Sequence, residues 1–254
     1  MNISSGILCT DLRKSINGKV ILNGVSIEAM PGRIIALLGP NGAGKTTSFS
    51  MLCGLIKPDS GHIFFKGNDI TDLPMYQRAR LGIGYLPQEA SIFRGLTVEE
   101  NINAILEMNG VGSIARENTL KNLLKELSLE YVRSAPAVNL SGGERRKLEV
   151  ARALANSPHF MLLDEPFAGI DPLAVSEMKD MILHLKQRKG IGVIITDHNV
   201  RDTLPIADYA YILHNGKVLI EGKPEDIIND VNAQKIYLGE SFSVHTSYYH
   251  GREK

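Results

Sequence analysis

The sequence predicts an α/β fold with a mostly parallel sheet, an N-terminal antiparallel β subdomain and an inserted helical subdomain. Three observations indicate this architecture. Short apolar runs of strand length alternate with helical patterns, which is typical of a parallel sheet. The N-terminal part instead contains two strand-like segments separated by a hairpin dipeptide. From about residue 97 to residue 139 the chain is rich in Leu, Glu, Lys and Asn at helical spacing.

The elements are expected in the following order. Segments 7–15 and 20–27 flank Asn17-Gly18, whose residues favour the positive φ angles of a tight hairpin turn. The run Ile34–Leu38 is apolar throughout, as in a strand covered on both faces, and a Gly-rich turn and a helix from about Lys45 follow it. Further strands are expected at 62–65, 83–86, 160–163 and 193–196, helix faces at Leu120, Leu123, Leu124, Leu127 and at Val175, Met178, Ile182, Leu185, and a second hairpin at 209–213 and 218–221 around Asn215-Gly216.

This order of elements suggests how the chain is divided. We expect residues 1–240 to form a single domain, with a core of residues 1–96 and 140–230 and a helical subdomain at about 97–139. Residues 241–254 are expected to form a loosely held C-terminal tail, since they are polar and aromatic without a clear period.

Composition excludes several classes of protein. The 254 residues include 28 basic and 28 acidic side chains, so the net charge is zero and no general attraction to nucleic acid or to an anionic membrane is expected. No apolar run approaches the roughly 20 residues that span a bilayer, and the N-terminus lacks a secretory pattern. The two cysteines, Cys9 and Cys53, give neither a disulfide framework nor a zinc pattern, which suits a reducing cytoplasm.

A phosphate-binding loop follows the apolar strand Ile34–Leu38. The residues Gly39, Pro40, Asn41, Gly42, Ala43, Gly44, Lys45 and Thr46 match the pattern G-x-x-x-x-G-K-[ST] without a mismatch, and Thr47 follows them. Glycines let the backbone curl so that N–H groups and the positive end of the helix surround phosphate oxygens. Lys45 would contact the β- and γ-phosphates, and the Thr46 hydroxyl would bind Mg²⁺. The motif predicts a P-loop NTPase core.

Two acidic residues end the strand at 160–163. Asp164 would reach the carboxyl edge of the sheet beside the phosphate loop and hold Mg²⁺, directly or through water. Glu165 faces another direction and can activate the water that attacks the γ-phosphate. Such a pair on its own is more often a helix cap or a solvated turn, but together with the phosphate loop it predicts hydrolysis.

A second anion site is expected at Ser141, Gly142 and Gly143. This segment offers a hydroxyl and exposed N–H groups before a helix. Because one chain rarely needs two phosphate sites for a single nucleotide, we expect this segment to contact the nucleotide held by another copy. Two chains related by a two-fold axis would then enclose two nucleotides.

These motifs together resemble the nucleotide-binding domain of ABC ATPases over about residues 7 to 230. The resemblance implies ATP and Mg²⁺ as ligands, with Gln88 as a glutamine that senses Mg²⁺ and the membrane subunit. It also implies that His198 contacts the γ-phosphate and that residues 168–171 lie at the dimer seam. The sequence departs from many relatives at Ile16, which stands where an aromatic residue stacks on adenine; an aliphatic side chain can cover the ring but has no π face.

Finer matches resemble the family of lipopolysaccharide-export ATPases. They lie at residues 85–94, 165–171, 196–201 and 236–240. The resemblance implies a cytoplasmic homodimer that docks on two inner-membrane subunits, with residues 91–94 near the groove that receives them, and contact with the membrane only through these partners. The alternatives are the ATPase of a branched-chain amino acid or other ABC importer, and a soluble ABC ATPase outside transport.

Overall fold

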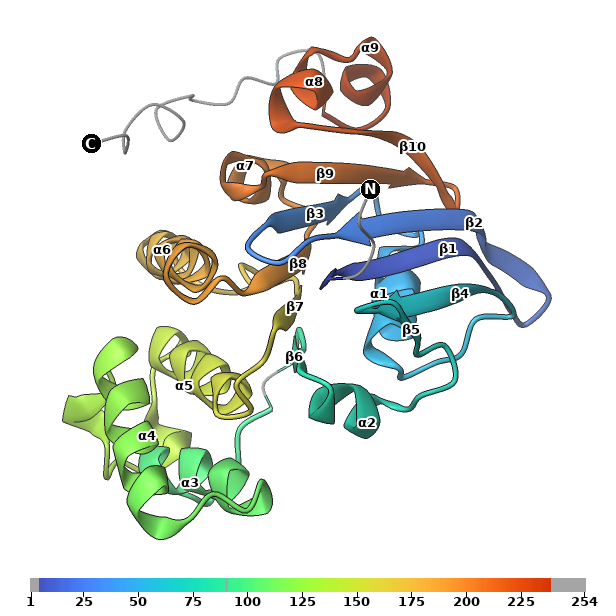
Figure 1. Cartoon of the computed structure of the whole chain (residues 1–254). Coiled ribbons are helices and arrows are strands. Elements are labelled where there is room, and N and C mark those ends of the chain that lie inside the picture. Colours follow the sequence, from blue (N-terminus) through green and yellow to red (C-terminus); the bar gives the residue numbers. More distant parts are fainter. Residues whose placement is uncertain (1–4, 90, 239–254) are drawn as a thin grey trace.

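The computed structural model describes residues 5–89 and 91–238, in which two sheets and their helices pack together (Figure 1). The strands are β1 (Ile7–Ile16), β2 (Lys19–Ala29), β3 (Ile34–Leu38), β4 (Ser60–Phe65), β5 (Asn68–Asp69), β6 (Ile83–Leu86), β7 (Phe160–Asp164), β8 (Gly192–Thr196), β9 (Tyr209–His214) and β10 (Lys217–Gly222). The helices are α1 (Lys45–Cys53), α2 (Met75–Arg80), α3 (Val98–Met108), α4 (Ser113–Glu126), α5 (Gly142–Leu154), α6 (Pro172–Lys189), α7 (Val200–Thr203), α8 (Pro224–Asn229) and α9 (Val231–Ala233). Single turns are η2 (Glu130–Val132), η3 (Ala137–Asn139), η4 (Leu204–Ile206) and η5 (Gln234–Leu238).

The smaller sheet is antiparallel and has the order β2-β1-β4-β5. Strands β1 and β2 form the expected hairpin, with Asn17 and Gly18 at φ angles of 50° and 77°. Two consecutive positive φ angles match the right-handed twist of the flanking strands, which explains why Asn-Gly occupies this turn. The predicted antiparallel subdomain is confirmed.

The larger sheet has the order β10-β9-β3-β8-β7-β6, and all neighbours except β10 and β9 are parallel. The expected strands are all present, with ends within two residues of the prediction. Because parallel strands end at one edge, the segments that follow β3, β6, β7 and β8 lie close together. The site described below lies at this edge.

The core lies on both faces of the larger sheet. Along β3, Ile34, Ala36 and Leu38 pack into a cluster with the buried side chains of α3, α5 and α6. Ile35 and Leu37 pack into a second cluster with α1 and the antiparallel sheet. The strand is therefore apolar at every position because side chains alternate between two covered faces.

The helices α3, α4 and α5 form the end of the molecule opposite α8 and α9 (Figure 1). Helix α3 begins at Val98, where Thr97 and Glu100 form a capping box. The predicted apolar face of α4 is buried at Leu120, Leu123 and Leu124. These contacts explain the helical spacing of this region, while the exact subdomain boundaries remain a prediction.

Helix α2 was not expected, since six residues give too little periodicity for a helix to be recognised. It is held by Arg78, a fully buried guanidinium that donates hydrogen bonds to the carbonyls of Leu73, Met51, Leu52 and Thr71. In residues 5–89 and 91–238 we find no helix with the length and apolar character of a bilayer span. The predicted tail at 241–254 lies outside the described residues.

Candidate nucleotide-binding and hydrolytic site

The phosphate-binding loop depends on glycine at two points of close approach. Gly39 has a φ of 146°, and a Cβ there would lie 2.3 Å from the carbonyl oxygen of Leu213. Gly44 has a φ of 105°, and its Cβ would lie 2.4 Å from Leu22 Cδ2. Neither space admits a side chain, so the glycines allow the loop to curl between β3 and α1.

Lys45 begins α1 and is nearly fully buried. Its Nζ donates hydrogen bonds to the carbonyl oxygens of Gly39, at 2.6 Å, and of Pro40, at 3.0 Å. Burial lowers the pKa of Lys45, and the carboxylates of Glu165, Asp197 and Asp164 oppose this shift. The ammonium is thus fixed by its own loop, as expected of a group that positions phosphate.

Asp164 ends β7 and lies 7% exposed opposite Thr196 of β8. Thr196 Oγ1 donates a hydrogen bond of 2.5 Å to Asp164 Oδ1. Burial is the largest effect on the pKa of Asp164 and raises it, while the Thr196 hydroxyl opposes that shift. Thr196 orients this carboxylate, a contact that the sequence did not predict because it joins two distant strands.

Two further side chains of the predicted site contact Glu165. Its φ is 44°, so its side chain departs from the direction of the strand, and its N–H donates to the Thr196 carbonyl at 2.9 Å. Gln88 Nε2 donates to Glu165 Oε2 at 2.9 Å, and His198 Nδ1 lies 3.4 Å from the same oxygen. Segments that follow β6, β7 and β8 therefore meet at one carboxylate.

Asp197 supports the segment that carries His198 and was missed by sequence reasoning. It is 1% exposed, and its Oδ1 accepts a hydrogen bond of 2.7 Å from the backbone N–H of Asn199 and lies 3.7 Å from His198 Nδ1. Burial raises the pKa of Asp197. The signal in the sequence was its place directly before His198, at the end of an apolar strand.

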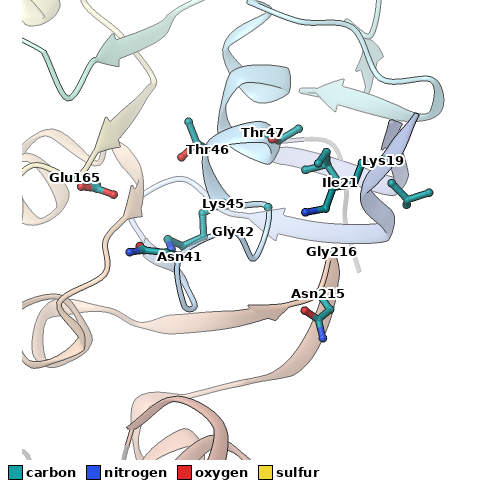
Figure 2. Close-up of a pocket in the computed structure, with 12 residues that line it drawn as sticks. Lys19, Ile21, Asn41, Gly42, Lys45, Thr46, Thr47, Glu165, Asn215 and Gly216 are labelled. Atoms are coloured by element: carbon teal, nitrogen blue, oxygen red, sulfur yellow. The ribbon is translucent and has the colours of Figure 1, made fainter. Parts of the chain in front are cut away.

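Of these groups, Lys45 and Glu165 border a cleft of about 420 Å³ (Figure 2). It is lined by Lys19, Val20, Ile21, Asn41, Gly42, Gly44, Lys45, Thr46, Thr47, Glu165, Asn215 and Gly216. The cleft includes much of the predicted phosphate loop, together with residues of β2 and the β9–β10 turn that the sequence did not indicate. Ile16 is exposed and does not line it, so its contact with a base stays a prediction.

Ser141, Gly142 and Gly143 do not line this cleft. Ser141 is the N-cap of α5, and its Oγ donates to Glu144 Oε2 at 2.6 Å. Tyr131 donates from its hydroxyl to Glu144 Oε1 at 2.5 Å. Within one chain the segment is therefore closed by its own capping box, and its contact with a second copy stays a prediction.

Comparison with known proteins agrees with this geometry. The family model described as ABC transporter matches residues 22–168. An ABC transporter ATP-binding protein of Rhizobium meliloti is 54% identical over 94% of this chain and 88% of its own length. The lipopolysaccharide export system ATP-binding protein LptB is 52% identical in Acidithiobacillus ferridurans and 47% in Escherichia coli, over 92% and 91% of this chain and 96% of each relative.

Solved structures agree as well. The ATP-binding cassette MJ1267 in its ADP conformation has a TM-score of 0.82 and 28% identity over 92% of this chain and 99% of its own. The predicted fold class and the resemblance to ABC ATPases are both confirmed. The family model matches more than half of the chain, and the relatives are similar over nearly all of it. Together with the phosphate loop and the carboxylates beside it, this shows that the chain belongs to the ABC transporter family, as an ATP-hydrolysing subunit.

Proposed function

We propose that this chain is the ATPase of a lipopolysaccharide exporter, acting as a head-to-tail homodimer on the cytoplasmic face of the inner membrane. Two transmembrane subunits would receive the motion, and the membrane would be reached only through them. The export assignment is supported by the relatives named LptB, which match nearly the whole chain. The observation that carries the hydrolytic assignment is the convergence of Gln88 and His198 on Glu165 beside the phosphate loop.

Each of these side chains has a separate task in hydrolysis. The N–H groups of residues 41–46 and the Lys45 ammonium hold the phosphates. Glu165 orients the attacking water and accepts its proton, which contributes about 10²- to 10⁴-fold to the rate. Gln88 and His198 orient Glu165 and stabilise the charge that develops on the γ-phosphate.

The donor set at the loop suits Mg²⁺. The Thr46 hydroxyl, the Asp164 carboxylate and the Gln88 amide offer oxygen atoms, which this hard cation prefers. Asp164 is also one of three carboxylates, with Glu165 and Asp197, that act electrostatically on Lys45. We therefore assign Thr46, Asp164 and Gln88 as the residues that would hold Mg²⁺, which neutralises phosphate charge when bound.

The second copy would supply Ser141, Gly142 and Gly143. Ser141 is the N-cap of α5, and Gly142 and Gly143 are its first residues, so their hydroxyl and N–H groups lie at the positive end of a helix long enough to contribute a dipole at the γ-phosphate. ADP lacks that phosphate, so closure would require ATP. Sedimentation of the Glu165→Gln protein with saturating ATP and Mg²⁺ tests this: a dimer is expected, and a protein that stays monomeric contradicts the proposal.

The membrane subunits would dock near Phe93. Phe93 is 43% exposed, but its ring is held in place because the guanidinium carbon of Arg152 lies 4.2 Å from the ring centroid. The backbone N–H of Phe93 donates to Asn101 Oδ1 at 2.9 Å. An exposed but fixed aromatic ring is typical of a contact surface. We propose that Gln88 and the helices within 97–139 transmit closure from the core at 1–96 and 140–230 to this surface.

Reconstitution separates the candidate transporters. Membrane subunits that co-purify with the chain should support ATP-dependent release of lipopolysaccharide from proteoliposomes, and the Glu165→Gln variant should abolish sustained release. Co-purification with subunits that take up branched-chain amino acids would overturn the export assignment but keep the ATPase. Failure to retain any membrane subunit would favour an ABC ATPase outside transport.

A further inference from the structure

The cleft beside the phosphate loop has two chemically different ends. Figure 2 shows Glu165 at one end, Lys45 and Gly42 between the ends, and Lys19, Gly216 and Asn215 at the other. A nucleoside triphosphate whose terminal phosphate lies beside Glu165 must direct its base and ribose toward the second end. The residues there face the part of the ligand that distinguishes one nucleotide from another.

The β9–β10 turn at this end is fixed to the phosphate loop. Gly216 donates its N–H to the Ala43 carbonyl at 3.1 Å and accepts a hydrogen bond of 2.8 Å from the Asn23 N–H. Asn215 and Gly216 have φ angles of 48° and 72°, the same kind of turn as in the N-terminal hairpin. The backbone that carries Asn215 is therefore held in place against the cleft.

The polar groups at this end are not used by the rest of the described chain. The Asn215 amide makes no hydrogen bond, and the Lys19 ammonium makes no ion pair, with any residue in 5–89 or 91–238. Val20, which is 61% exposed, and the methylenes of Lys19 add apolar surface to the same wall. A flat heterocycle with a polar edge requires this combination of groups.

The geometry points to Asn215 as a specificity-determining residue that hydrogen-bonds the edge of the base, while Val20 and Lys19 cover its face. This inference rests on the proposed function in taking ATP as the ligand. An amide offers both a donor and an acceptor, which suits the adjacent amino group and ring nitrogen of adenine. Ile16 does not line the cleft, so the contacts with the base assigned here come from Asn215 at its edge and from Val20 and Lys19 on its face.

Three ligands and four variants test the inference, with affinity as the readout. ATP, GTP and inorganic triphosphate report on adenine, guanine and phosphate binding separately. Asn215→Gly keeps the turn, because glycine accepts a positive φ, and should weaken ATP binding about five- to tenfold without changing triphosphate affinity. Lys66→Gly is the matched control, since Lys66 and Gly67 form a turn of the same kind at φ 50° and 79° elsewhere; it should change neither affinity.

A carboxylate at position 215 should change the preference between ATP and GTP, which a purely structural role of Asn215 would leave unchanged. Asn215→Asp keeps the shape but only accepts hydrogen bonds, and guanine presents two adjacent donors where adenine presents one. The ratio of GTP affinity to ATP affinity should rise about tenfold, and the ratio cancels any general repulsion of phosphate by the new charge. Lys45→Ala should instead weaken ATP and triphosphate together.

Two outcomes overturn the inference in distinguishable ways. If Asn215→Gly binds ATP like the wild type and Asn215→Asp keeps the wild-type GTP-to-ATP ratio, while Lys45→Ala loses both ligands, Asn215 does not read the base and the proposed function stands. If the wild type binds neither ATP nor triphosphate, the proposed function fails and this inference fails with it.

Discussion

Two Gly-rich segments of this chain precede a helix, and they differ in what surrounds them. Residues 39–46 border a cleft shared with Glu165, and Lys45 lies within electrostatic range of three carboxylates. Ser141 and the glycines after it lie outside that cleft, with the hydroxyl bound to Glu144 of the same helix. Within one chain, the first segment therefore lies beside the groups of the proposed hydrolytic site. The second segment does not, and we propose that it acts on a nucleotide held by another copy.

The largest effect is expected at the first segment. Glu165→Gln keeps the shape of the side chain but removes the base, so ATP turnover should fall by about 10²- to 10⁴-fold while ATP binding is unchanged. Steady-state phosphate release and equilibrium ATP binding measure the two quantities. Turnover at the wild-type rate would remove Glu165 from its role. Glu177→Gln, which changes an exposed carboxylate of α6 that pairs with Lys147, serves as the control for loss of a carboxylate.

A mixing experiment compares the two segments directly. Ser141→Ala should lower turnover by about 10²-fold, the usual cost of losing one donor to a developing oxyanion, and Lys45→Ala should do so by abolishing phosphate binding. Dimers that combine one copy of each variant retain one intact pair of segments, so mixing should restore part of the activity. Two separately inactive proteins that stay inactive when mixed would contradict a site shared between chains.

The first segment could be predicted from sequence because its groups are consecutive or end on recognisable strands. The pattern at 39–46 and the apolar strand before Asp164 each carry their own signal. Thr196 and Asn215 could not be predicted this way, because their places depend on contacts between distant segments. Thr196 pairs with Asp164 across β7 and β8, and the turn that carries Asn215 is held to Ala43 through Gly216. The hairpins, by contrast, followed from single Asn-Gly dipeptides.

A pair of glycine variants separates backbone strain from crowding near the first segment. Gly216 and Gly67 have φ angles of 72° and 79°. A Cβ at Gly216 would lie 2.3 Å from the Ile21 carbonyl oxygen, whereas a Cβ at Gly67 would have no neighbouring atom within 4 Å. Gly67→Ala should cost about 1 kcal/mol of unfolding free energy, and Gly216→Ala about 2 to 3 kcal/mol, with weaker ATP binding. Equal losses in urea denaturation would show that the β9–β10 turn is not fixed to β2.

The smallest effect concerns the capping box of the second segment. The Ser141 hydroxyl, the Tyr131 hydroxyl and the Ser141 N–H, in that order, lower the pKa of Glu144 from its ordinary value of 4.5. A lowered pKa means that the ionised Glu144 stabilises the folded chain fully above that value, and that this stability is lost as the pH falls through the folded-state pKa.

Glu144→Gln isolates this charge, because Gln retains the hydrogen bonds of a capping box. The wild type should exceed the variant in urea stability at neutral pH, and the difference should shrink as the pH drops below 4.5. A difference that is constant with pH would mean that the charge of Glu144 does not hold Ser141.

The dimer of the same variant should close more readily around ATP. A neutral amide holds the Ser141 hydroxyl less strongly than a carboxylate does, so it competes less with a γ-phosphate.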